Sequence, residues 1–537
     1  MISNSFDSAV GAFLSAESRL GILGNRGSIQ LCLLYPNLYA LGIANLGFNR
    51  IWQLLDRESD ITVERAFYLE PPHHAVPKSW EWKRPFGAFH VLAFSLSSEE
   101  DYPAVLEFLM SSGIQPRSSK RKPRDPIVIA GGLAPTLNPR PLSLYFDALC
   151  IGDGELLIPS LKRVITGSTG GWDRQQVLEN LAATPGIWVP SLKEPDMPIA
   201  SWRFSDDPLG PARSMAISPQ GHFGSMFLVE VGRGCGRLCF YCATCYSVPH
   251  RIWSAEVLEN TIDQWARPPG PVGLVGAALS DHPELRQIVE NLVTRGYRLG
   301  LSSFRADILD RGLLELLRRG QVETITIAPE AGSESLRERI GKPISNERIL
   351  ETARWIAEAG FPRLRCYYMT GLPGETSDDI ETLIFLCRRI QSTIRSTNSQ
   401  TRLDIRISPF VPKPGTPFQW APLALESALK KAQQRIRSAL EGQHGITLRM
   451  TSPSEAWQEA LFSRGDERVG LAIEEALRTE KSLRQTAVQF GIDLKTITHP
   501  LPVDQPLPWR QIQRHISPQF LEKQWSKSIG PPEPQSG

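Results

Sequence analysis

Residues 233–246, "RGCGRLCFYCATCY", gather half of the chain's eight cysteines into one short segment: Cys235, Cys239, Cys242 and Cys245. In a reducing compartment such a group of thiols is more often a metal or redox site than a set of disulfides. The spacing C-x3-C-x2-C brings three thiolates into one loop, and thiolates are the ligands of iron-sulfur clusters. The segment therefore predicts a metal centre.

The composition is that of an ordinary globular protein. Of 537 residues, 41% are hydrophobic and 22% are charged, and the length allows about three domains of roughly 150 residues each. The formal net charge of +2 creates no strong field, so nucleic acid is not indicated as a partner. Partners must therefore be inferred from individual sites.

Targeting and membrane-spanning signals are missing from the sequence. The first 20 residues show no basic segment followed by an apolar one. No uncharged apolar run reaches the ~18 residues that a transmembrane helix needs. We therefore expect no membrane span and a cytoplasmic location.

Residues 223–441 contain six apolar runs of strand length, each followed by a helical pattern. The runs are FLVEV, VGLVGAAL, RLGLSS, ETITIAP, LRCYYMTG and DIRISPF. Six consecutive β/α units predict a parallel sheet that closes most of a barrel, a partial (β/α)6 TIM-type barrel. The loops that follow the strands build the active site of such barrels, and the cysteines follow the first strand.

The rest of the chain flanks this barrel. Residues 1–200 alternate short apolar runs with helical segments such as 101–110, which predicts a doubly wound, Rossmann-like α/β domain. Its AGG and GDGE glycines either border a ligand or close tight turns. Residues 201–222 are expected to be a linker. Residues 442–537 are expected to be a mostly helical C-terminal region with a disordered tail, GPPEPQSG.

The cysteine spacing at the end of the first barrel strand resembles that of the radical S-adenosylmethionine (SAM) enzymes. Other segments look like the subgroup in which a cobalamin-binding-type domain precedes the barrel, and like an uncharacterised branch of it. These segments are TIAPEAGSESLRERIGK, YYMTGLPGETSDDI, LLYPNLYALGIANLGFNRIW, IAGGLAPTLNPRPL and FVPKPGTPFQW. The resemblance covers roughly residues 28–440.

The resemblance implies a 4Fe-4S cluster held by Cys235, Cys239 and Cys242, with one iron open to the amino and carboxylate groups of SAM. An electron from the cluster would cleave SAM to a 5′-deoxyadenosyl radical, which abstracts hydrogen from the substrate. A reductant such as flavodoxin or ferredoxin is the implied partner. Tyr241 occupies the aromatic position that family members carry just before the third cysteine.

The resemblance also implies contacts to SAM after the second and third strands. Gly276 and Ala277 occupy the motif whose backbone meets the amino group of SAM, although the usual glutamate of that motif is missing. Ser303 and Arg305 lie where relatives contact the ribose and carboxylate, and an arginine fork suits a carboxylate. The alternative for Arg305 is a surface ion pair with Asp307.

Two further candidate contacts follow the fourth and fifth strands. Glu330 is expected to face the sulfonium or the ribose of SAM, or else to cap the next helix near Ser333. Gly371 and Gly374 either let the backbone approach an adenine-sized ligand or make a turn before the helix cap Thr376. No catalytic residue is indicated.

Histidine-ligated cobalamin is not expected in the N-terminal domain. The chain lacks the Asp-x-His-x-x-Gly run that carries such a ligand, and the early loop YPNLYALG has no histidine. Three interpretations stay open: a corrinoid without a histidine ligand, another bound molecule, or a purely structural domain.

Cys245 leaves two alternatives to the enzyme open. It extends the run to C-x3-C-x2-C-x2-C, so four thiolates are available for an iron-sulfur electron carrier or a zinc-binding structural module. Among enzymes, methylthiolation is disfavoured because the first 200 residues hold only Cys32 and Cys150 for a second cluster. Rearrangement, cyclisation and oxidation stay open, methyl transfer would need a corrinoid, and the substrate is not indicated.

Overall fold

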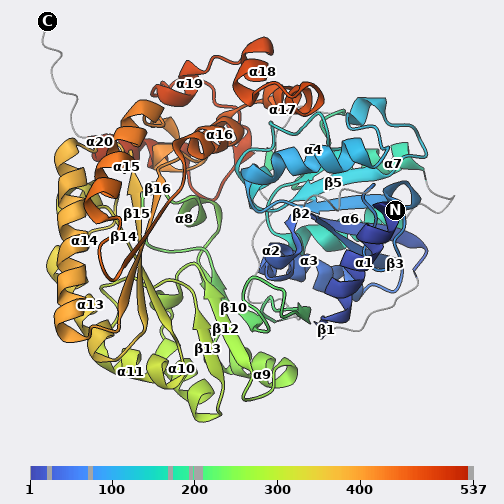
Figure 1. Cartoon of the computed structure of the whole chain (residues 1–537). Coiled ribbons are helices and arrows are strands. Elements are labelled where there is room, and N and C mark those ends of the chain that lie inside the picture. The colour runs from blue at the N-terminus through green and yellow to red at the C-terminus, as the bar shows by residue number, and fades with distance from the viewer. Residues whose placement is uncertain are drawn as a thin grey trace, which may run out of the picture. The chain divides into compact units, whose positions relative to one another are not determined.

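The computed structural model describes residues 2–20, 27–69, 76–166, 173–192, 197–198 and 210–529. The chain forms two compact units (Figure 1). Unit 1 consists of Met1–Leu228, Leu461–Leu494 and Pro506–His515, and unit 2 of Val229–Ala460, Lys495–Gln505 and Ile516–Gly537. Residues 201–209 of the predicted linker and the predicted disordered tail, 530–537, lie outside the described residues.

Unit 1 is built on a six-stranded sheet in the order β3-β2-β4-β5-β6-β7. Its strands are β2 (Ile29–Leu38), β3 (Ile61–Tyr68), β4 (Val91–Ser95), β5 (Ile127–Gly131), β6 (Ala148–Cys150) and β7 (Ile187–Trp188). All pairs are parallel except β6 with β7. The parallel strands follow the order 2-1-3-4-5 of doubly wound folds, with a topological switch point between β2 and β4. The predicted α/β domain is confirmed.

Most helices of unit 1 lie between its strands in the chain, whereas one precedes them and two come from residues 467–489. They are α1 (Ile2–Ser15), α2 (Tyr39–Ile43), α3 (Leu46–Asp56), α4 (Tyr102–Ser111), α5 (Leu133–Leu137), α6 (Gly154–Thr166), α7 (Arg174–Ala182), α17 (Glu467–Thr479) and α18 (Leu483–Gln489). Val105, Leu106 and Leu109 of α4 are buried, as their helical spacing predicts. In the AGG segment, Gly132 connects β5 to α5 with φ +118°. A Cβ at this position would lie 2.3 Å from the carbonyl oxygen of Leu96, so the turn requires glycine.

Unit 2 contains the six predicted barrel strands. They are β10 (Phe227–Arg233), β12 (Pro271–Gly276), β13 (Arg298–Leu301), β14 (Thr324–Glu330), β15 (Arg363–Thr370) and β16 (Arg402–Pro409). With β11 (Arg251–Ile252) and β17 (Ile446–Met450) they form two sheets, ordered β11-β10-β12-β13 and β14-β15-β16-β17. A parallel bridge from Phe304 to Ile327 joins the sheets. The predicted partial barrel is confirmed.

A further strand lies at the edge of this barrel. β17 (Ile446–Met450) pairs in parallel with β16, although the sequence analysis expects helix beyond residue 441. All five side chains of β17 are exposed or half-buried, so the strand lacks the continuous apolar run that marks the others. The barrel therefore extends one strand beyond the six predicted.

Helices cover one face of the barrel strands (Figure 1). Those of unit 2 are α8 (Ala243–Ser247), α9 (Ala255–Trp265), α10 (Leu285–Thr294), α11 (Arg311–Arg319), α12 (Glu334–Arg339), α13 (Asn346–Glu358), α14 (Ser377–Thr397), α15 (Glu426–Leu440), α19 (Lys495–Thr498) and α20 (Pro518–Ile529), while α16 (Pro453–Arg464) spans the boundary between the units. Tyr368 of β15 lies against Cys387 of α14, so the even-numbered positions of β15 face this helix. The odd-numbered positions therefore face away from it, because side chains alternate along a strand.

Candidate active site

The cysteine loop connects β10 to α8 at the carboxyl end of the first barrel strand. It begins at Gly234, where φ is +65° and a Cβ would lie 2.3 Å from the carbonyl oxygen of Val248. The N–H of Phe240 donates to the carbonyl oxygen of Ile340 at 3.0 Å, and the carbonyl of Phe240 accepts from the N–H of Phe418 at 3.2 Å. Backbone hydrogen bonds from two separate segments thus fix the loop.

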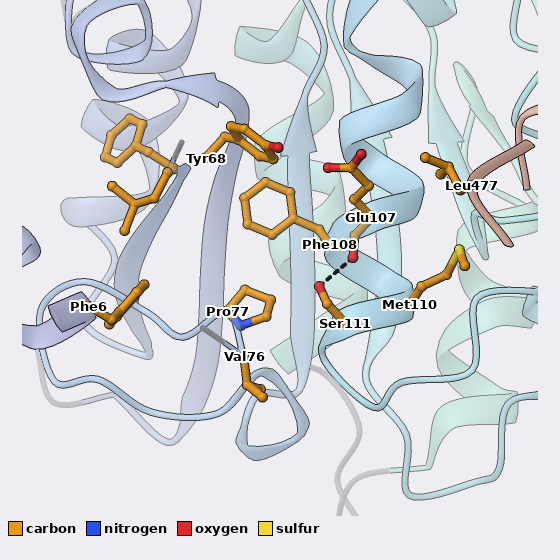
Figure 2. Close-up of a pocket in the computed structure, with 11 residues that line it drawn as sticks. Phe6, Tyr68, Val76, Pro77, Glu107, Phe108, Met110, Ser111 and Leu477 are labelled. Atoms are coloured by element: carbon orange, nitrogen blue, oxygen red, sulfur yellow. Dashed lines mark hydrogen bonds between the residues drawn. The ribbon is translucent and has the colours of Figure 1, made fainter. Parts of the chain in front are cut away.

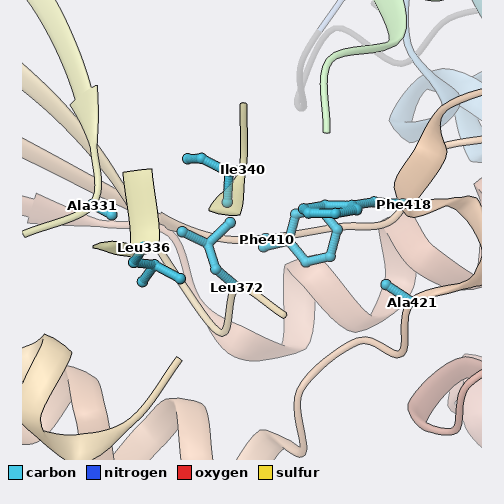
Figure 3. Packing of buried hydrophobic residues seen from close by; sticks show 7 residues of the cluster. All are labelled: Ala331, Leu336, Ile340, Leu372, Phe410, Phe418 and Ala421. Carbon is cyan, nitrogen blue, oxygen red and sulfur yellow. The ribbon is translucent and has the colours of Figure 1, made fainter. Parts of the chain in front are cut away.

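An apolar cluster supports the same loop. Phe240 and Tyr241 pack against it from the cysteine loop, Met369 from β15 and Trp525 from α20. Figure 3 shows the cluster itself, which consists of Ala331, Leu336, Ile340, Leu372, Phe410, Phe418 and Ala421. Segments that follow three barrel strands contribute to this cluster, so the position of the loop depends on the folded barrel.

The three thiols of the loop and the thiol of Cys245, in α8, lie close together. Cys235 and Cys242 are half-buried, and the thiol of Cys245 lies within hydrogen-bonding reach of both. This contact lowers the pKa of Cys235 to about 7 and that of Cys242 to about 6, whereas it raises the pKa of Cys245. Burial raises the pKa of Cys239 to about 11. Two of the three predicted cluster ligands are therefore disposed to ionise near neutral pH.

The donors of this loop suit an iron-sulfur cluster, because all four are thiols held by one short segment. Within the described residues, no group of three or more Cys, His, Asp and Glu side chains is arranged to hold a single metal ion.

Glu330 links the fourth strand to the cysteine loop. Its Oε1 atom accepts a hydrogen bond from the hydroxyl of Tyr241 at 2.8 Å and lies 2.7 Å from Nζ of Lys342. Glu330 has φ +70°, a conformation that non-glycine residues rarely adopt. The next helix, α12, is capped by Ser333 and not by Glu330. Of the two roles considered for Glu330, helix capping is thus not the one observed.

Lys342 is a residue of this site that the sequence analysis missed. Its side chain is 9% exposed, and its positive charge acts to lower the pKa of Cys239. The segment "IGKP" offers little sign of this role, because Lys342 meets Glu330 only after α12 has turned the chain back. A buried cation beside a thiol favours the thiolate.

The candidate contacts after the second and third strands lie at strand ends as predicted. The N–H of Gly276 donates to Oγ of Ser302 at 3.2 Å, Ala277 follows β12 directly, and Ser303 is exposed. Arg305 pairs through Nε and Nη2 with both carboxylate oxygens of Asp307, at 3.0 and 2.9 Å. The arginine therefore makes the alternative ion pair, and a contact with SAM stays a prediction.

Gly371 closes the turn after the fifth strand. Its φ is +77°, and a Cβ would lie 2.8 Å from Cδ2 of Leu429. Its N–H donates to Oε2 of Glu375 at 2.5 Å, and burial raises the pKa of this carboxyl to about 7. Gly371, Gly374 and Glu375 line a cavity of about 210 Å³. The segment thus makes a tight turn and also borders this cavity.

In unit 1, polar side chains gather at the switch point of the sheet. Nδ2 of Asn45 lies 3.0 Å from Oγ of Ser97 and 3.5 Å from the hydroxyl of Tyr35. Asn37 donates to Asp101 at 2.7 Å, and burial raises the pKa of Asp101 to about 6. This edge is where doubly wound folds bind ligands.

A separate cavity of about 520 Å³ lies in unit 1 (Figure 2). Tyr68 at the end of β3 and Phe108 of α4 line it, and among the lining residues that the structure describes Glu107 alone is charged. The other lining residues are Phe6, Phe67, Leu69, Val76, Pro77, Met110, Ser111 and Leu477. The cavity is thus mostly apolar and lies apart from the polar side chains at the switch point.

Two family models match the chain. The model described as the radical SAM superfamily matches residues 229–387, which contain the cysteine loop and most of the barrel. The model described as the N-terminal part of radical SAM proteins matches residues 47–190. The chain belongs to the radical SAM superfamily. Members of this superfamily are enzymes, and the fold and cysteine spacing agree with that assignment.

The chain is also similar to individual radical SAM proteins and to a protein of unassigned role. An uncharacterized protein of Methanocaldococcus jannaschii is 27% identical over 441 residues, which are 82% of this chain and 89% of that protein. The cobalamin-dependent SAM radical enzyme OxsB, solved with aqua-cobalamin and SAM, aligns with a TM-score of 0.49 and 11% identity over 94% of this chain and 79% of OxsB. Methylornithine synthase (PylB) aligns with a TM-score of 0.29 and 12% identity over 52% and 83%.

Among the helices described here, none combines the length and the apolar character that crossing a bilayer requires.

Proposed function

We propose that this radical SAM enzyme binds a 4Fe-4S cluster through Cys235, Cys239 and Cys242 and uses it to cleave SAM. The observation that carries the proposal is the convergence of these thiols in a loop fixed at the carboxyl end of β10. When bound, such a cluster with one open iron supplies the electron that breaks the sulfonium bond of SAM and yields the 5′-deoxyadenosyl radical.

The chain's own residues hold and orient the reactants in this proposal. Lys342 and Glu330 fix Tyr241, and with it the segment between Cys239 and Cys242. The backbone at Gly276 and Ala277 meets the amino group of SAM. Ser303 and Arg305 receive its ribose and carboxylate, for which Arg305 must exchange its pairing with Asp307.

The experiment is anaerobic reconstitution with iron and sulfide, followed by spectroscopy and product analysis. We expect about four irons per chain, an EPR signal of the reduced cluster that changes on addition of SAM, and 5′-deoxyadenosine by mass spectrometry. Removing Cys235, Cys239 or Cys242 should abolish all three results. An EPR signal of the reduced cluster that does not change on addition of SAM would contradict the proposal.

A second candidate function is a four-thiolate electron carrier, and the proximity of Cys245 to Cys235 and Cys242 favours it. In that case Cys245 completes the ligand set and no iron is open to SAM. Loss of the cluster in Cys245→Ala, together with an EPR signal that SAM does not change, would establish the carrier. A colourless bound zinc ion would instead indicate the structural module.

The N-terminal domain is proposed to be of the cobalamin-binding type, with a corrinoid bound without a histidine ligand. The doubly wound strand order and the polar side chains at its switch point support a ligand there. Mass spectrometry of protein purified from cobalamin-supplied cells tests the corrinoid. A reductant such as flavodoxin or ferredoxin is the proposed protein partner.

A further inference from the structure

The face of β15–β17 that turns away from the helices carries arginines on three neighbouring strands. The strand registers pair Arg365 with Asp404 and Arg406 with Arg449. Parallel register partners lie side by side on the same face of a sheet. The three arginines therefore form one group on the inner face of the barrel.

Asp404 orients two of these arginines. Nε of Arg365 donates to its Oδ2 at 2.8 Å, and Nε of Arg406 donates to its Oδ1 at 3.0 Å. The carboxylate is 5% exposed, whereas the side chains of Arg365 and Arg406 are 26% and 27% exposed. Each guanidinium has five N–H donors, so both keep donors for a ligand.

The charge of this group is not balanced within the strands of the barrel. The strands contain three acidic residues, and two of them have their own cations: Glu230 pairs with Arg233 and Glu330 with Lys342. Only Asp404 remains to balance Arg365, Arg406 and the exposed Arg449, and two further exposed arginines, Arg363 and Arg402, lie on the same face closer to the amino ends of their strands. The group therefore keeps a net charge of at least +2 on the inner face of the barrel, which attracts anions.

The surroundings of the arginines suit a substrate that extends toward the cysteine loop. Tyr367, which is 40% exposed, is the register partner of Arg406. Two positions closer to the carboxyl end, Oγ of Ser408 lies 3.1 Å from Oγ1 of Thr451. At about 3.3 Å per residue, Arg406 and Arg449 lie roughly 7 Å below this pair of hydroxyls, and Arg365 lies about twice as far below it. The carboxyl end is where barrels of this type perform their chemistry.

We infer that Arg365, Arg406 and Arg449 bind a doubly charged oxyanion of the substrate, of the phosphate type, while the reacting carbon lies toward the cysteine loop. The inference rests on the proposed function for the direction of the substrate, but not for the anion site itself. A net charge of +2 matches a phosphate monoester dianion better than a single carboxylate. Arginine forks also bind phosphate oxygens in pairs.

The test measures binding of two probes, inorganic phosphate and acetate, to the reconstituted protein by equilibrium dialysis at low salt. We expect phosphate to bind at least five-fold more tightly than acetate. Arg406→Gln and Arg449→Gln should each weaken phosphate binding at least five-fold. Arg449 is exposed, so its replacement should leave the fold intact. Arg435→Gln on α15, which breaks an exposed pair with Glu381, is the matched control and should bind phosphate as the wild type does.

The outcomes separate this inference from the proposed function. Equal phosphate binding by the wild type, Arg406→Gln and Arg449→Gln would overturn the anion site, as would equal loss in Arg435→Gln or no binding by the wild type at millimolar phosphate. Tighter binding of acetate would overturn the assignment of a dianion. Formation of 5′-deoxyadenosine is assayed in parallel, and its failure with intact, arginine-dependent phosphate binding would count against the proposed function alone.

Discussion

Nζ of Lys342 lies 2.7 Å from Oε1 of Glu330, and the two side chains are 9% and 12% exposed. The same carboxylate oxygen holds the hydroxyl of Tyr241, which stands between two of the predicted cluster ligands. A turn that follows the fourth barrel strand is thereby connected to the loop that follows the first. The ion pair stabilises the cysteine loop by a contact far from it in the sequence.

Replacing Lys342 with methionine should destabilise the protein by about 3 kcal/mol, because removal of one partner leaves a buried carboxylate unpaired. The double variant Lys342→Met, Glu330→Gln should recover a large part of this loss, since no charge is then left unpaired. Urea unfolding of both variants measures the difference. Equal destabilisation in the single and double variants would show that the ion pair does not account for the cost.

Gly234→Ala should destabilise the protein by about 2 kcal/mol or more and lower the iron bound on reconstitution. The reason is both the positive φ and the carbonyl oxygen of Val248, 2.3 Å from the new methyl group. Gly296→Ala is the matched control, with φ +85° but open space around the added Cβ. It should cost only about 1 kcal/mol and leave the iron content unchanged. Equal losses in the two variants would show that crowding at Gly234 is unimportant.

The elements that the sequence predicts well are those with a strong local pattern. The six barrel strands are apolar runs, and α14 shows helical spacing at Ile380, Leu383, Ile384 and Cys387, all of which are buried. β17 was missed because its side chains are not buried in a continuous run. Periodicity reports burial, so a strand at the edge of a partial barrel gives little signal.

The candidate site was predictable only where neighbours in sequence are also neighbours in space. Arg305 and Asp307 are two residues apart, and their ion pair is one of the two alternatives that the sequence offers. The contact of Lys342 with Glu330 depends on the turn made by α12, and that of Arg449 with Arg406 on the register of β17. Such contacts follow from the fold and not from a motif.

Cys245→Ala should keep about four irons per chain and an EPR signal that responds to SAM, if Cys245 is a neighbour of the cluster and not a ligand. Its thiol lies within hydrogen-bonding reach of Cys235 and Cys242, and donors to ligand sulfurs raise the reduction potential of such clusters. We therefore expect a lower potential in Cys245→Ala, measured by EPR-monitored redox titration. Cys245→Ser retains a donor and should restore part of the shift. An unchanged potential in both variants would rule out this influence.

Glu375 should make the stability of the protein depend on pH between about 4.5 and 7. Burial raises the pKa of this carboxyl from 4.5 to about 7, so the folded state holds a proton that the unfolded state has already lost in this range. Stability should therefore fall as the pH rises from 4.5 to 7 and should change no further above that. The full effect is on the order of 3 kcal/mol, since each pKa unit corresponds to about 1.4 kcal/mol.

Glu375→Gln keeps an acceptor for the N–H of Gly371 but has no charge to bury. Its stability relative to the wild type, from urea unfolding at pH 5 and pH 8, should rise with pH, whereas Glu381→Gln, at an exposed position, should show no such trend. Parallel curves for the wild type and Glu375→Gln would show that the carboxyl ionises equally in the folded and unfolded states.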